Sequence, residues 1–264
     1  MQENKTAKSV ILYVSLAFGL PLICVLLIKN LSVFQAGTPN FMLFGFEAMT
    51  PVISALLATA MLGGRKELSA FLRKLYIRNI KISYILLAAI MPIAVLTATK
   101  LTLLLSGNAA QLLSSITLKK LVIVLWALVA EEIGWRGFFQ ENVGAKFGYI
   151  TTPLIVGGVW ALWHFHFFWT GTMSAPILLF MLGCIAESYG YYWVTERSKG
   201  NIIPASVWHF TGNLFISLYT IAPSYNNGST LPYLLFVGYT ILMALIIVFC
   251  EHNARKCVPG RYQK

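Results

Sequence analysis

Residues 130–137, AEEIGWRG, place two carboxylates and one guanidinium inside a run of apolar side chains. The run extends from Leu118 to Phe139 and is long enough to cross a bilayer core of about 30 Å at ~1.5 Å per residue. A single charged side chain at mid-membrane costs roughly 2.5–3.5 kcal/mol, so such residues face a protein interior, pair with one another and mark function. The segment therefore predicts a transmembrane helix that carries a buried polar site.

Helical spacing separates the two glutamates of this segment. Glu132 and Arg136 are four residues apart and share a helix face, whereas Glu131 points about 100° away from Glu132. We predict a structural ion pair between Glu132 and Arg136, because pairing lowers the cost of burying both charges. Glu131 then presents an unpaired carboxylate to a neighbouring helix and is the candidate for chemistry. The alternative is a purely architectural ion pair with a spare acid.

The composition indicates a polytopic membrane protein. Of the 264 residues 58% are hydrophobic and 11% are charged, which lies outside the range of soluble globular domains. We expect an all-α transmembrane helix bundle of about eight helices, forming one membrane domain over residues 1–264 with a core at residues 118–222. The apolar spans are residues 9–28, 41–62, 83–105, 118–139, 151–170, 174–195, 201–222 and 231–250.

The net charge of +11 comes from Lys and Arg in alternate loops. Short basic loops stay cytoplasmic, so both termini are expected inside a multi-pass protein of the plasma membrane. No basic stripe with interleaved aromatics occurs outside the loops, which argues against nucleic acid and leaves the lipid bilayer as the partner of the positive charge. Residues 65–81 are expected to form either an amphipathic helix at the inner surface or a plain basic loop.

Two later spans contribute polar side chains that can meet Glu131. His164 and His166 are two residues apart, so only one of them can face a given site, whereas His209 and Asn213 are four apart and share one helix face. Depths from the inner membrane edge are roughly 12 Å for Glu131, 20 Å for His164 and 12 Å for His209. These side chains are therefore predicted to share one cavity, with helix packing as the alternative role. Three other intramembrane charges are left out of this site: Glu47, Lys100 and Glu187.

Together the three clusters resemble the signature of the CPBP family, also called Abi, which comprises CAAX proteases and bacteriocin-processing enzymes and is related to the type II CAAX prenyl endopeptidases. The resemblance covers roughly residues 118–222. The sequence departs from it at Trp160, where the family usually has Phe, a change expected to affect packing more than chemistry. The matching motifs are E-E-x-x-x-R at Glu131–Arg136, F-x-x-x-H at Trp160–His164 and H-x-x-x-N/D at His209–Asn213.

The resemblance implies an intramembrane endopeptidase with Glu131 as the catalytic glutamate. In the preferred version Glu131 and His164 activate a water molecule, His209 and Asn213 hold the oxyanion, and no cofactor is required. A second version places Zn²⁺ on Glu131, His164 and His209, although no His-Glu-x-x-His motif is present. The expected substrate is a membrane-associated peptide or lipidated protein, either a CAAX-type C-terminus or the leader of a bacteriocin or pheromone.

Two other classes of function remain as alternatives. The first is a non-catalytic immunity or regulatory protein of the same fold, in which the polar cluster only stabilises a binding scaffold. The second is a transporter with charged residues along a path, but the inverted repeats and broken helix pairs typical of transporters are not visible in the sequence.

Overall fold

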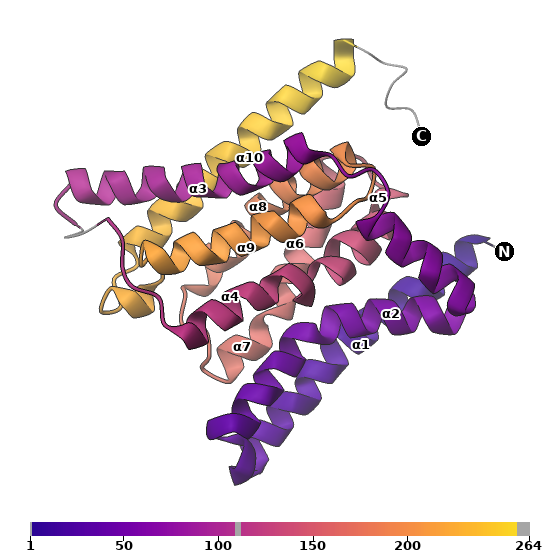
Figure 1. The fold of residues 1–264 in the computed structure, drawn as a ribbon, viewed down its shortest axis with the longest axis horizontal. Coiled ribbons are helices and arrows are strands. Elements are labelled where there is room, and N and C mark those ends of the chain that lie inside the picture. The colour runs from indigo at the N-terminus through magenta and orange to yellow at the C-terminus, as the bar shows by residue number, and fades with distance from the viewer. Residues whose placement is uncertain (1, 109–111, 258–264) are drawn as a thin grey trace.

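The computed structural model describes residues 2–108 and 112–257, and the regular structure in these ranges is helical throughout (Figure 1). The predicted all-α bundle is confirmed. Predictions for residues 1, 109–111 and 258–264, including the two chain ends, lie outside the described residues. The helices are α1 (Gln2–Asn30), η1 (Ser32–Phe34), α2 (Gly37–Tyr76), α3 (Ile82–Leu105), α4 (Leu118–Ala130), η2 (Ile133–Phe139), α5 (Gln140–Gly144), α6 (Thr151–Trp163), α7 (Phe165–Trp169), α8 (Ile177–Arg197), α9 (Ile203–Leu218), η3 (Pro223–Tyr225) and α10 (Leu231–Cys257).

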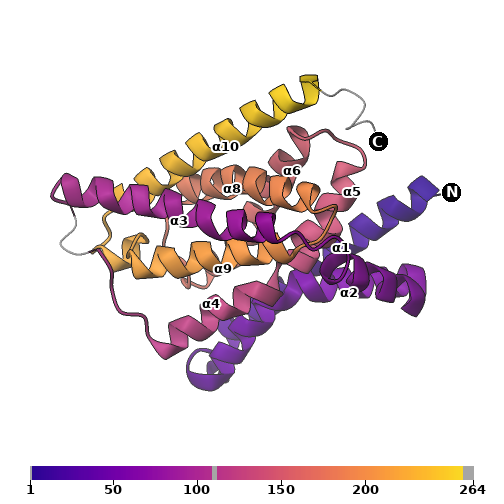
Figure 2. The same cartoon turned by 45° about the horizontal axis from the view of Figure 1, so that its top comes forward.

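Helix α9 occupies a central position in the bundle. It packs between α3 and α4 in both Figure 1 and Figure 2, and it also contacts α8. Helix α8 in turn packs against α6 and α10, while α1 and α2 form a hairpin at one side of the bundle. The three segments that carry the sequence motifs, α4 with η2, α6 and α9, therefore converge on the interior.

Five of the described helices are long and apolar enough to cross a membrane: Ala7–Asn30, Gly37–Tyr76, Ile82–Leu105, Ile177–Arg197 and Leu231–Lys256. These helices indicate an integral membrane protein. The motif segments predicted as spans 118–139, 151–170 and 201–222 instead contain shorter helices, with 13 residues in α4, 13 in α6 and 16 in α9. At ~1.5 Å per residue, 13 residues cover about 20 Å, so these helices end at membrane depth. Irregular backbone at that depth is tolerated only where protein buries it or where it lines a cavity.

Helix α2 bends sharply where its apolar span ends. Gly64 has φ +73° and ψ −176°, a conformation that other residues rarely adopt, and residues 65–76 continue as a second helical stretch in a new direction. This part of the expected amphipathic helix is therefore present. Its apolar face packs on the protein: Leu75 is fully buried, and the rings of Phe71 and Phe138 lie 6.3 Å apart.

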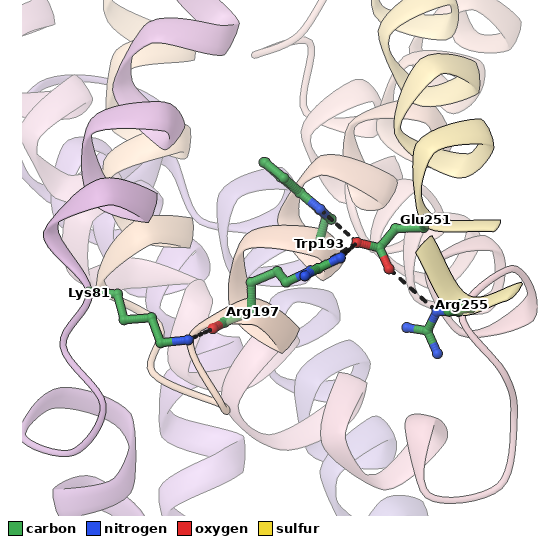
Figure 3. Close-up of polar contacts among 5 residues, drawn as sticks. All are labelled: Lys81, Trp193, Arg197, Glu251 and Arg255. Carbon is green, nitrogen blue, oxygen red and sulfur yellow. Dashed lines mark hydrogen bonds and ion pairs between the residues drawn. The ribbon is translucent and has the colours of Figure 1, made fainter. Parts of the chain in front are cut away.

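A charged network ties together the ends of three helices (Figure 3). Glu251 of α10 accepts hydrogen bonds from Trp193 Nε1 over 3.0 Å and from Arg197 Nε over 2.9 Å, both in α8, and pairs with Arg255 one turn further along α10. Lys81, at the start of α3, donates to the backbone carbonyl of Arg197 over 2.6 Å. Because Glu251 is buried, this network fixes α8 against α10 at the end of the bundle where Lys and Arg gather.

Close packing of α6 against α8 depends on Gly157. A methyl group there would lie 2.6 Å from the Cα of Ile185 and 2.9 Å from Ser188 Oγ, whereas a methyl group on the adjacent Gly158 would meet nothing within 4 Å. Gly157→Ala should lower the free energy of unfolding by about 1–3 kcal/mol through overpacking. Gly158→Ala, in the same helix, should leave it unchanged or slightly raised. Thermal unfolding in detergent measures both, and equal melting temperatures for the two variants would contradict the α6–α8 contact.

Candidate functional site

The motif that opens the site lies where helix α4 stops. The α-helix ends at Ala130, and Glu131 adopts φ −127° and ψ −37°, outside the helical range. Residues Ile133–Phe139 then form a fully buried π-helical segment. The prediction of one regular helix over residues 118–139 is therefore wrong, because the chain leaves the α-helical hydrogen-bond pattern at Glu131. Such π-helical turns widen the helix locally and are frequent at functional sites.

Glu132 forms the centre of a buried ionic network. Its Oε2 lies 3.3 Å from Arg136 Nε, so the two side chains predicted to pair are brought together. Its other partner is His209, which helical spacing alone did not predict: His209 Nδ1 donates to Glu132 Oε1 over 2.8 Å. Glu132 and Arg136 are each only 1% exposed. Glu132 therefore joins the π-helical segment to α9 and determines how the His209 ring is oriented.

Aromatic rings enclose the Arg136 guanidinium. Its central carbon lies 4.4 Å from the ring centre of Trp160 in α6 and 3.9 Å from that of Tyr191 in α8. A guanidinium over an aromatic face is attracted by the negative face of the ring, most strongly where water is excluded. The buried cation thus has one carboxylate partner and two ring faces, and it links η2 to α6 and α8.

Glu131 has a different partner from Glu132, as the helical spacing predicted. Trp160 Nε1 donates to Glu131 Oε2 over 2.7 Å in a buried hydrogen bond. Besides the expected packing role, Trp160 makes a contact that a phenylalanine could not make, because its indole N–H holds one oxygen of this carboxylate. The side chain that departs from the family motif is thus in direct contact with the candidate catalytic group.

The histidines of the fifth predicted span are separated by the end of α6. The helix stops at Trp163, and His164 Nδ1 donates to the Trp160 carbonyl over 2.8 Å. His166 Nδ1 donates instead to the Trp163 carbonyl over 2.5 Å. His164 lines the central cavity and His166 is not among the residues that line it. Only one of the two rings faces the site, in agreement with the two-residue spacing.

A cavity of about 410 Å³ brings the predicted residues together. Glu131, His164, His209 and Asn213 all line it, from three segments that are far apart in the sequence. His164 Nδ1 is hydrogen-bonded to a backbone carbonyl, and His209 Nδ1 is hydrogen-bonded to a carboxylate. The Nε2 atom of each ring is therefore available to a bound molecule. Most of the remaining wall is apolar or aromatic: Phe44, Ala48, Ile123, Val124, Trp126, Ala130, Phe167, Met173, Phe180, Ile216, Tyr233 and Phe236 belong to it.

One further carboxylate lines this cavity and was left out of the predicted site. Glu187 lies in α8 on the face that also presents Gly183, Cys184 and Tyr191 to the cavity. These four residues follow the three- and four-residue spacing of one helix face. The spacing was visible in the sequence, but which face of α8 turns inward is decided by its packing between α6 and α10.

A metal site requires convergent ligands. Within residues 2–108 and 112–257, no group of three or more His, Cys, Asp or Glu side chains is arranged to hold a metal ion. Glu131, His164 and His209 line one cavity but are not grouped as a ligand set in this conformation.

Comparison with known proteins supports the family resemblance of the segment that carries the motifs. Residues 113–215 match the family described as Type II CAAX prenyl endopeptidase Rce1-like, and the matched segment contains all three motifs. The resemblance to the CAAX protease family is confirmed. The chain is also similar to the CAAX prenyl protease 2 of Methanococcus maripaludis, with 24% identity over 141 residues that cover 47% of this chain and 52% of the relative. The chain thus spans about half the length of this curated relative.

The buried Glu132–Arg136 pair should dominate the stability of the family core. Glu132→Gln leaves the Arg136 charge buried without its counter-ion and should lower the free energy of unfolding by about 3–5 kcal/mol. Replacing both partners, as in Glu132→Gln with Arg136→Met, removes the uncompensated charge and should restore part of that loss. A double-mutant cycle measured by unfolding in detergent gives the coupling energy. Additive effects of the two substitutions would contradict a direct pairing.

Proposed function

We propose that this protein is an intramembrane endopeptidase that hydrolyses a peptide bond of a membrane-associated substrate. The observation that carries the proposal is the cavity in which Glu131, His164, His209 and Asn213 meet, each histidine oriented by a hydrogen bond through Nδ1. The names of the matching family and of the archaeal relative support a CAAX-type protease. The apolar helices support action at a membrane, and we propose the plasma membrane as its location.

Hydrolysis needs an activated water, a place for the oxyanion and a proton for the leaving amine. In the proposed mechanism the Glu131 carboxylate takes a proton from a water molecule that His164 Nε2 also contacts. The water oxygen then bonds to the peptide carbonyl carbon. Trp160 occupies Oε2 of Glu131, which leaves Oε1 for this water.

Two side chains of α9 that line the cavity hold the oxyanion, and Glu131 protonates the leaving group. In its protonated form His209 donates from Nδ1 to Glu132 and from Nε2 to the oxyanion, and the Asn213 amide supplies a second donor. The tetrahedral intermediate collapses when the C–N bond breaks and Glu131 transfers its proton to the amine nitrogen. The products are an amine and a carboxylic acid, which loses its proton to solvent to become a carboxylate, and Glu131 is ionised again.

The substrate proposed here is a peptide segment close to the membrane surface, either the C-terminus of a prenylated protein or the leader of a secreted peptide. The largely apolar wall of the cavity suits a lipid-associated or hydrophobic chain. The preferred mechanism requires no cofactor, and a chelator distinguishes it from a zinc-dependent version of the same protease.

Substitution of the cavity residues tests the proposed activity. Glu131→Gln and His164→Ala should abolish cleavage of a leader-peptide library by detergent-purified protein, because each removes a group that activates water. Asn213→Ala should slow cleavage about 10²- to 10³-fold, the usual cost of one oxyanion donor. His166→Ala is the matched control, since this ring does not line the cavity and the chemistry should survive its loss. Full proteolysis by Glu131→Gln would refute the proposal, and loss of activity with a chelator would favour the zinc version.

Trp160→Phe tests the unexpected contact with Glu131. The substitution keeps an aromatic side chain and removes the Nε1 donor, so the Glu131 carboxylate loses one fixed hydrogen bond. We expect kcat to fall about 10-fold or more, as for loss of a hydrogen bond to a charged group. The rate constant for cleavage and the melting temperature should be measured together. An unchanged kcat in a folded variant would show that Trp160 acts only in packing.

A further inference from the structure

Glu187 is a carboxylate at mid-membrane depth that the proposed mechanism does not use. Ten residues separate it from each end of α8, which corresponds to about 15 Å in either direction. It lines the same cavity as Glu131 and His209 and is half-buried there. An ionisable side chain at this depth is expensive, and its presence points to a partner with which it interacts.

The described part of the chain offers Glu187 no hydrogen-bond or ion-pair partner. Other intramembrane carboxylates differ in this respect: Glu131 is held by Trp160, and Glu132 by Arg136 and His209. Glu47, which also lacks a partner for Oε1, is only 1% exposed and does not line the cavity. Glu187 therefore combines a missing partner with access to the space that a substrate would enter.

The surroundings of Glu187 suit a cation. Tyr191, one helical turn away, and Tyr233 and Phe236 of α10 contribute aromatic rings to the cavity wall. Gly183, one turn before Glu187, has no side chain of its own, and a methyl group there would lie 3.4 Å from Val237 Cγ2 and 4.0 Å from Tyr233 Oη. An ammonium or guanidinium group in such a place gains both a carboxylate and ring faces. The positive charges of Arg136 and protonated His209 are matched by the two carboxylates Glu132 and Glu131, and Lys120 also lines the cavity.

We propose that Glu187 forms a specificity subsite that binds a lysine or arginine side chain of the substrate peptide next to the scissile bond. The inference rests on the proposed function, because Glu187 shares its cavity with the groups assigned to hydrolysis. The chain as a whole carries a net charge of +11, which by itself favours acidic peptides. A preference for basic peptides would therefore originate in the cavity and not at the surface.

The test compares reporter peptides that differ only in having Lys, Gln or Glu at each position beside the cleavage site in turn. Wild type should cleave the best Lys peptide with kcat/KM about 10-fold or more above its Gln counterpart. Glu187→Gln should reduce this ratio to about 1, and Glu187→Lys should turn the preference towards the Glu peptide. Glu47→Gln, which removes an equally unpartnered buried carboxylate outside the cavity, should leave the ratio unchanged. Equal Lys-to-Gln ratios in wild type and in both Glu187 variants would overturn the subsite.

A binding measurement separates this inference from the proposed function. Fluorescence anisotropy of labelled Lys and Gln peptides is measured on the Glu131→Gln protein with and without Glu187→Gln. The Lys peptide should bind about 10-fold more tightly, and this advantage should disappear when Glu187 is replaced. Charge-dependent binding without any cleavage by wild type would overturn the protease and retain the subsite. Cleavage that requires Glu131 but shows no dependence on Glu187 in rate or binding would overturn only the subsite.

Discussion

The structure depends on one carboxylate, that of Glu132, which is shared between Arg136 and His209 in the membrane interior. Neither the anion nor the guanidinium could be buried alone without a cost of several kcal/mol. Because Arg136 also lies between the rings of Trp160 and Tyr191, this single group of contacts joins the π-helical segment to α6, α8 and α9. The orientation of His209 follows from its bond to Glu132 and from the rings of Trp160 and Tyr191 that pack against it.

The helices that carry the motifs are shorter than the membrane is thick, and this has a direct consequence for the site. Glu131 lies where α4 ends, with backbone angles outside the helical range, and His164 lies at the junction of α6 and α7. The longer helices α3, α8 and α10 supply the spans that keep the bundle in the membrane.

The wall of the cavity has a polar part and an apolar part. Hydrogen-bonded polar groups gather where α4, α6 and α9 meet, and aromatic and aliphatic side chains form most of the rest of the wall. An apolar wall lowers the local dielectric constant and strengthens each polar interaction at the site. It also provides the surface that a hydrophobic peptide would contact. The half-buried Glu187 is a further charged group in that wall, on a helix that contributes nothing to the proposed hydrolytic set.

Much of this protein was predictable from its sequence. The apolar composition determines an all-α membrane bundle. The four-residue spacing of Glu132 and Arg136 indicates that they pair, because helical periodicity and the cost of buried charge act locally. The different partners of Glu131 and Glu132 follow from the same periodicity. The motifs also identify His164, His209 and Asn213 as candidates, since each lies within an otherwise apolar span.

Only the tertiary structure decided which of these groups touch. The bonds from His209 to Glu132 and from Trp160 to Glu131 join residues 77 and 29 positions apart, a separation that no local pattern encodes. The early end of α4 and the inward face of α8 also depend on neighbouring helices, because packing selects among local conformations and faces that the sequence alone permits. The sequence determined the fold class and the chemical groups available to the site. The packing of α6, α8 and α9 around one buried carboxylate decided how those groups are arranged.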